Sequence, residues 1–211
     1  MKNQELIEKT LSNLRKNQMD ARYVQNREEL LRVLDELIQP GDTVSFGGSM
    51  TLFETGTMDY LKRLEEEQKI VFLDRNRPGI TPQQVQEIYH QAFSADVYFT
   101  SSNAITSDGY LYNVDGNGNR VAAMIYGPKS VVVIAGCNKL VETKEDAVKR
   151  LEQCAAPANA KRLNMNTPCA KTGVCAHCMV EDRICSNYVW FGRQRTLNRI
   201  KVILVGEEYG Y

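Results

Sequence analysis

Four cysteines stand close together in the stretch TPCAKTGVCAHCMVEDRICSNY, toward the C-terminal end of the sequence. Two thiolates separated by two residues can bind one metal, and two further thiolates complete its coordination by four sulfurs. Disulfides are the other common use of clustered cysteines, but they belong to small secreted chains, and the sequence opens on a charged, helical segment without a signal peptide. We therefore predict a metal site whose ligands are Cys169, Cys175, Cys178 and Cys185.

The spacing of these cysteines also bears on which metal they would hold. A structural zinc ribbon usually has two C-x2-C pairs, and here only Cys175 and Cys178 form one. The single pair shifts the balance modestly toward an iron–sulfur cluster, with Zn as the close alternative.

A glycine-containing turn at residues 47–51, GGSMT, is the second feature that could do chemistry. Gly47 and Gly48 would let backbone amides approach an anion, and the hydroxyls of Ser49 and Thr51 add donors at the start of a predicted helix. A phosphate or a carboxylate would fit such a turn. The competing interpretation is a tight turn in which Ser49 or Thr51 only caps the helix. Glu54, one turn into that helix, is the candidate acid or base.

The third feature is a segment rich in Asn, Asp and Gly over residues 101–120, SSNAITSDGYLYNVDGNGNR. It follows a predicted strand, so its polar side chains should reach the same sheet edge as the glycine turn. Asp-Gly between alternating apolar residues predicts a hairpin, and two turns without further function are the alternative interpretation. The candidate substrate-binding residues here are Asn103, Asp108, Asn113, Asp115, Gly116, Gly118, Asn119 and Arg120.

Alternating helical and strand patterns surround these segments and predict an α/β fold, a mainly parallel sheet with helices on both faces. The run SVVVIAG at residues 130–136 is typical of a strand buried on both faces. Other strands are predicted at 43–48, 69–74, 96–102 and 199–206. Helices are predicted at 4–17, 27–38, 49–68, 81–93 and 144–163, the last one interrupted near Pro157.

These elements indicate one domain over residues 1–211. Within it we expect N-terminal helices over 1–40, an α/β core over 41–160, a four-cysteine metal-binding segment over 164–190 and a final strand over 199–206. The amphipathic N-terminal helix pair could mediate a homodimer.

The motifs FGGSMTLFETG and SNAITSDGYLYNVDGNGNRVAAMIYGPKSVVVIAG resemble the LUD domain of LutC-like lactate-utilisation proteins, earlier catalogued as a domain of unknown function. This resemblance spans most of the chain. It implies the wider fold of glucosamine-6-phosphate deaminase, ribose-5-phosphate isomerase and the CoA transferases (NagB/RpiA/CoA transferase-like). It also implies work alongside other lactate-utilisation or iron–sulfur proteins.

The segment that begins at Asn103 is similar, more distantly, to methylthioribose-1-phosphate isomerase and its initiation-factor relatives. In the isomerase a catalytic aspartate takes the place that Asn103 has here. An amide cannot accept and return a proton as a carboxylate does, so the resemblance argues against aldose–ketose isomerisation and for a role of Asn103 in substrate binding.

Composition excludes several classes of partner. The chain has 26 basic and 26 acidic side chains, so no net field attracts nucleic acid or an anionic membrane. No segment is apolar over the length of a bilayer, and we expect a cytoplasmic protein.

Three functions stay open from the sequence. The first is an oxidoreductase component in which the pocket binds a small hydroxy or keto acid and an iron–sulfur centre carries electrons. The second is a transferase or isomerase for a phosphorylated or CoA-linked substrate, with structural zinc and Glu54 at the reacting group. The third is a noncatalytic module that binds a metabolite or assembles other proteins, because no nucleophile–base pair stands out.

Overall fold

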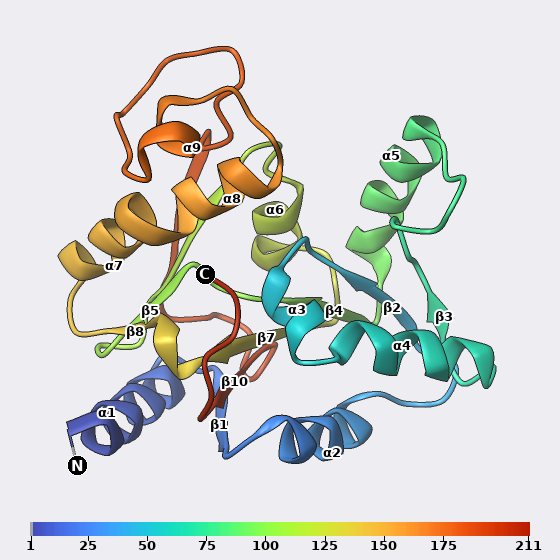
Figure 1. The fold of residues 1–211 in the computed structure, drawn as a ribbon. Coiled ribbons are helices and arrows are strands. Elements are labelled where there is room, and N and C mark those ends of the chain that lie inside the picture. Colours follow the sequence, from blue (N-terminus) through green and yellow to red (C-terminus); the bar gives the residue numbers. More distant parts are fainter. Residues whose placement is uncertain (1) are drawn as a thin grey trace.

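The computed structural model describes residues 2–211 and is built on a six-stranded parallel sheet (Figure 1). Across the sheet the strands run in the order β1-β10-β7-β4-β2-β3. Their bounds are Asp20–Val24 (β1), Thr43–Phe46 (β2), Val71–Phe72 (β3), Val97–Thr100 (β4), Ser130–Gly136 (β7) and Ile200–Val205 (β10). The predicted α/β class with a mainly parallel sheet is confirmed.

Both faces of this sheet are buried, as the apolar run of β7 predicts. Val131 and Val133 pack into the core that α1 and α6 cover, whereas Val132 and Ile134 pack into the core beneath α2 and α4. The helices are α1 (Lys2–Lys16) and α6 (Asn119–Ile125) on one face, and α2 (Arg27–Leu37) and α4 (Thr57–Glu66) on the other. The apolar stripes of α1 and α2 are therefore used by the chain's own core.

Side-chain caps fix where several helices begin. Asn26 accepts a hydrogen bond from the Glu29 amide at the start of α2. Thr81 forms a capping box with Gln84 at the start of α5 (Pro82–Gln91), and Thr143 forms one with Asp146 at the start of α7 (Lys144–Arg150). Each box satisfies backbone N–H groups that have no partner inside the helix.

A smaller four-stranded sheet, with the order β8-β5-β6-β9, lies beside the main one. The predicted hairpin at Asp108 and Gly109 joins its antiparallel strands β5 (Ala104–Thr106) and β6 (Leu111–Asp115). Gly109 has φ +84°, and an added Cβ would lie 2.7 Å from the Asn13 backbone of α1. The outer strands are β8 (Leu140–Val141) and β9 (Asn187–Phe191).

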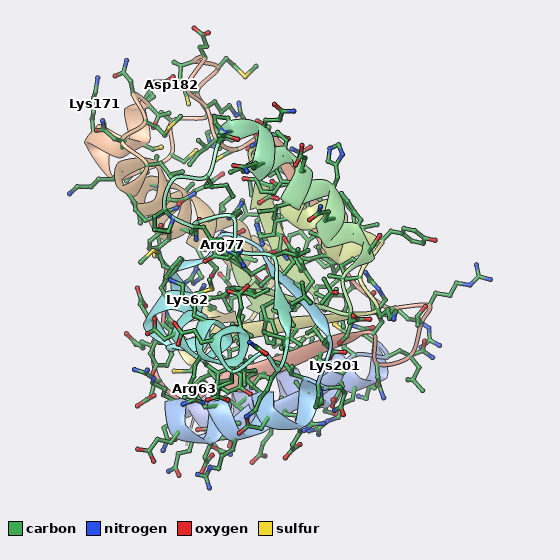
Figure 2. All side chains as sticks on the ribbon, turned by 90° about the vertical axis from the view of Figure 1, so that its right-hand side faces the viewer. Lys62, Arg63, Arg77, Lys171, Asp182 and Lys201 are labelled. Carbon is green, nitrogen blue, oxygen red and sulfur yellow. The ribbon has the colours of Figure 1, made fainter. Side chains whose placement is uncertain are left out.

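The predicted helix at 144–163 is one helical run, with a π-helical turn at Leu151–Ala155 between α7 and α8 (Ala156–Arg162). Pro157 lies in the first turn of α8, after the π turn rather than at a break. Next comes the short helix α9 (Pro168–Thr172). In both views the α9 region lies at the end of the molecule opposite α1 and α2, and Figure 2 labels Lys171 and Asp182 there.

Two predicted segments differ in detail from the structure. The N-terminal helices are separated by β1, an edge strand paired in parallel with β10. The predicted helix 49–68 consists of two helices, α3 (Met50–Glu54) and α4, separated at Gly56. Gly56 has φ +72° and the Arg27 guanidinium packs against it, which leaves no room for a side chain. Among residues 2–211, no helix is both long and apolar enough to cross a bilayer.

Candidate functional site

The carboxyl ends of three neighbouring strands meet at one pocket. β2 leads into Gly48 and Ser49, β4 leads into Ser101, and β7 leads through a short 3-10 turn to Lys139. Parallel strands bring these loops to the same edge of the sheet, which is where α/β folds bind ligands. The cavity has a volume of about 90 Å³. Its other walls come from Met50, Ser102, Asn103, Val114, Asp115, Arg120, Leu151, Ala155, Ala156, Asn159, Arg162, Ile184, Cys185 and Tyr211.

The glycine turn allows arginine side chains to approach the backbone. A Cβ at Gly47 would lie 2.7 Å from Cγ of Arg120, and one at Gly48 would lie 2.5 Å from Nη2 of Arg75. The Gly47 amide donates to the Phe99 carbonyl and so belongs to the sheet. Ser49 stands at the N-cap of α3 without a side-chain capping bond, so capping does not explain its hydroxyl.

Lys139 is the most unusual residue of the pocket, and the sequence interpretation missed it. Only 3% of its surface is exposed, and its Nζ donates to Thr51 Oγ1 at 2.8 Å and to Ser101 Oγ at 3.1 Å. No ion pair formed by the described residues includes it. Burial, and after it the positive charges of Arg150 and Arg120, lower the pKa of Lys139 to about 7.

A signal for Lys139 does exist in the sequence. Lys139 follows the apolar run SVVVIAG by three residues. Residues just after a predicted strand are expected at the sheet edge where ligands bind, and this argument, which singled out Asn103, applies to Lys139 as well.

The hydrogen bonds of Arg120 hold one wall of the pocket together. It is 8% exposed, and its guanidinium has five N–H donors, for which the structure supplies five acceptors. Those acceptors are Asp115 Oδ1 at 2.9 Å, Asn113 Oδ1 at 2.5 Å, Asn103 Oδ1 at 3.4 Å, the Ser101 carbonyl at 3.1 Å and the Val114 carbonyl at 3.1 Å. Arg120 therefore shapes the wall and keeps no free donor for a ligand.

The other predicted residues of the Asn/Gly-rich segment divide into two groups. Asn103 and Asp115 line the pocket, and Asn113 is buried behind it, where it donates to Ser102 Oγ at 3.2 Å. Gly116 and Asn119 line an adjoining cavity on the same rim.

Six predicted substrate-binding or catalytic residues line neither the pocket nor the adjoining cavity: Gly47, Thr51, Glu54, Asp108, Asn113 and Gly118. Asp108 is exposed at the β5–β6 turn, where it accepts a hydrogen bond from the Thr106 hydroxyl. Gly118 is the N-cap of α6, with φ +81°. The Glu54 carboxylate accepts the Gly210 amide at 2.5 Å, so it holds residues 206–211 in place.

The rim shared by the pocket and the adjoining cavity carries more positive charge than negative charge. Arg162 Nε donates to the Tyr211 hydroxyl at 2.7 Å, and Arg75 Nη1 donates to the Tyr89 hydroxyl at 2.8 Å. The buried Nε of Arg75 has no hydrogen-bond partner. Neither arginine takes part in an ion pair of the described chain. With Lys139 they make this rim suited to an anion.

The four predicted metal ligands lie around one small cavity, together with His177 and Arg183. Arg183 donates to the Cys185 carbonyl at 2.7 Å and to the Cys178 carbonyl at 2.6 Å, which ties two of the loops together. Burial, and after it nearby Cys175 and Cys169, raise the pKa of the Cys185 thiol to about 11. All six cysteines are free thiols.

This arrangement is not a formed coordination site. Within residues 2–211, no three His, Cys, Asp or Glu side chains stand close enough together to hold a metal ion. The structure therefore gathers the four cysteines without showing the metal centre that the sequence predicts.

The cysteine cavity and the pocket share part of their walls. Ala156, Ile184 and Cys185 line both of them. Directly after Cys185, the Ser186 amide donates to the Asp115 carbonyl at 2.9 Å, and Asn187 pairs with Asp115 in the small sheet. The cysteine segment is thus attached to the pocket wall by backbone hydrogen bonds.

Comparison with known proteins gives a family model and a fold. The model of the LUD domain matches residues 7–205. The crystal structure of a DUF162 family protein from Deinococcus radiodurans is similar over 97% of this chain and 98% of that chain, with 12% sequence identity and a TM-score of 0.55. This likeness shows a shared fold.

Two further solved structures are similar over part of their length. Ribose 5-phosphate isomerase from Plasmodium falciparum has 12% identity over 55% of this chain and 52% of that one, with a TM-score of 0.35. The eIF2B beta from Chaetomium thermophilum has 12% identity over 57% of this chain and 44% of that one, with a TM-score of 0.34. No curated protein matches the chain.

Proposed function

Because this chain belongs to the LUD domain family, we propose that it takes part in lactate utilisation and that its pocket binds a small hydroxy or keto acid. One observation carries the proposal: Lys139 is buried at the pocket without a carboxylate partner. A buried lysine in such a place is costly for the fold, and an anionic ligand would supply the missing negative charge.

The polar groups around Lys139 match the oxygens of such an acid. Arg162 and Arg75 add positive charge at the rim for a carboxylate. The hydroxyl of Ser49, which makes no capping bond, is available as a neutral partner for a hydroxyl or keto oxygen. A cationic pocket with a few converging hydroxyls suits a small ligand of this class better than an extended apolar one.

Titration calorimetry with lactate and pyruvate tests the pocket. We expect saturable binding of at least one of them by the full chain, and at least a tenfold weaker affinity for Lys139→Met, since one desolvated charge contact is worth about 1.4 kcal/mol or more. Lys62→Met, which removes an exposed lysine of α4 (Figure 2), should bind as the unchanged chain does.

Other ligands distinguish the alternatives. Binding of sugar phosphates or CoA esters in place of either acid would contradict the proposal and favour the transferase or isomerase. Equal loss of affinity in Lys139→Met and Lys62→Met would remove the pocket from consideration.

A second proposal concerns the cysteines: we propose that they bind a metal centre, with an iron–sulfur cluster modestly favoured over Zn, and that the protein serves as an oxidoreductase component. The observation that supports it is the convergence of all four cysteines on one cavity. A closer approach of the loops would bring their sulfurs into one set, as in proteins whose metal completes the fold. A cluster there would supply one-electron chemistry, and zinc would hold the segment together.

Metal analysis of protein purified without oxygen tests this proposal. We expect iron with acid-labile sulfide and a visible absorption band, or zinc without one, and loss of most of the metal in Cys175→Ser. The matched control is Cys154→Ser, because Cys154 is exposed and does not line the cavity. A chain that binds neither metal, or a control that loses as much metal as Cys175→Ser, would contradict the metal centre.

A further inference from the structure

We propose that Lys139 reacts with the keto carbon of a 2-oxo acid and holds it as an imine in the pocket. This inference rests on the proposed function, because it names the reactive group for one member of the proposed ligand class. It begins from the hydrogen bonds of Nζ. Nζ donates one hydrogen bond to Thr51 Oγ1 and one to Ser101 Oγ, and no third hydrogen-bond partner is present among the described residues.

As long as no anion is bound, a neutral amine fits this environment better than an ammonium ion. An amine has two N–H bonds, which the hydroxyls of Thr51 and Ser101 accept, and its lone pair occupies the remaining direction. An ammonium ion would present a third N–H and a full charge without a carboxylate to offset them. The lowered pKa of Lys139 agrees, since a value of about 7 leaves a large fraction of the amine neutral at neutral pH.

Both hydroxyls keep other partners that hold them in place. Thr51 Oγ1 donates to the Tyr209 carbonyl at 3.2 Å, and Ser101 Oγ lies 3.4 Å from Thr51 Oγ1. The amine is thus positioned by side chains from the loops after β2 and β4, whereas Lys139 itself follows β7. Such positioning reduces the ordering cost of attack on a bound carbonyl.

Residues 206–211 cover this amine on one side. An added Cβ at Gly210 would lie 3.3 Å from Lys139 Nζ and 2.5 Å from Thr51 Oγ1. The Gly210 carbonyl accepts Asn138 Nδ2 at 2.9 Å, and its amide donates to Glu54. Exclusion of water at this place favours the imine, because water is a product of its formation.

The reaction balances without an oxidant or a reductant. The lone pair of Nζ attacks the keto carbon, a C–N bond forms, and the carbonyl oxygen takes a proton to give a carbinolamine. Loss of that oxygen as water, with the second amine proton, gives the C=N bond. The carboxylate of the acid stays intact and remains in the pocket that Arg162 also lines.

Reductive trapping tests the inference. The full chain is incubated with pyruvate and sodium borohydride, and intact mass and peptide maps are recorded. We expect one reduced pyruvyl group on the peptide that contains Lys139, and none after incubation with lactate, which has no keto group. Lys139→Arg keeps a cation but should form no adduct, whereas Lys62→Met should form as much adduct as the unchanged chain.

The failure of this inference differs from failure of the pocket itself. Calorimetric binding of pyruvate without a trapped adduct would overturn the imine and leave the anion pocket standing. An adduct that persists in Lys139→Arg, or spreads over many lysines, would also overturn it. Absence of both binding and adduct for pyruvate and lactate would remove the proposed function as well.

Discussion

Arg120→Ala is expected to lower the free energy of unfolding by about 3–5 kcal/mol, the usual cost of removing one partner from a buried ion pair. The substitution leaves the Asp115 carboxylate without its ion-pair partner and removes the hydrogen bonds that Asn113 and Asn103 accept from the guanidinium. Urea denaturation followed by circular dichroism measures the change. If Arg120→Ala does not fold, Arg120→Lys, which keeps the charge and loses most donors, should show a smaller loss.

The control for this prediction is an exposed arginine. Arg22 pairs with Asp20 and Glu36, but its side chain is 37% exposed. Arg22→Ala should cost less than about 1 kcal/mol, as surface pairs do. Equal effects at the two positions would mean that the Arg120 hydrogen bonds contribute no more than a surface pair.

Lys139→Met is expected to raise the free energy of unfolding by several kcal/mol at pH 7 and below. Methionine has similar length and carries no charge to bury, and the hydroxyls of Thr51 and Ser101 keep other partners. The stabilised variant should also be the one that loses ligand binding, as is common where function requires a buried polar group.

The pH dependence of the gain in unfolding free energy shows whether the buried charge of Lys139 causes it. The ordinary lysine pKa of 10.5 falls to about 7 in the folded chain, so between these values the unfolded chain binds the additional proton. The cost of Lys139 is therefore largest below pH 7 and disappears as the pH rises toward 10.5. The charged groups that act on it are Arg150 and Arg120, which lower its pKa, and Glu54 and Cys154, which raise it.

Urea denaturation of both chains at pH 6, 8 and 10 measures the difference. We expect the advantage of Lys139→Met to shrink steadily across this series, because all other groups are shared. A difference that stays constant with pH would show that packing, and not the buried charge, separates the two chains.

Most of the main sheet could be predicted from the sequence, because apolar and β-branched residues are concentrated in every strand except β1. The run at 130–136 is β7 without adjustment. Strand β1, DARYV, alternates polar and apolar residues over only five positions at the sheet edge, so it was hidden between two strong helical patterns. Strand β9 pairs with β6 across more than seventy residues, and no local pattern shows such a pairing.

The position of the candidate site in the fold could be predicted from the sequence, but the roles of its residues could not. The expectation that polar residues after parallel strands meet at one sheet edge led to Ser49, Asn103 and Asp115, which do line one pocket. It could not show that Arg120 has all its donors satisfied, because the acceptors come from separate strands and turns. Lys139 was missed because a lysine is usually a solvated surface residue, and only the fold buries it.

Ala156, Ile184 and Cys185 line both cavities, so a displacement of Cys185 alters the walls of both. An occupant of the cysteine cavity that moves or charges Cys185 changes the free energy of an anion in the pocket. By reciprocity the anion changes the affinity of the cysteines for their occupant by the same factor. Under the two proposals, metal content and acid affinity would therefore be coupled, and each has to be determined with the other held fixed.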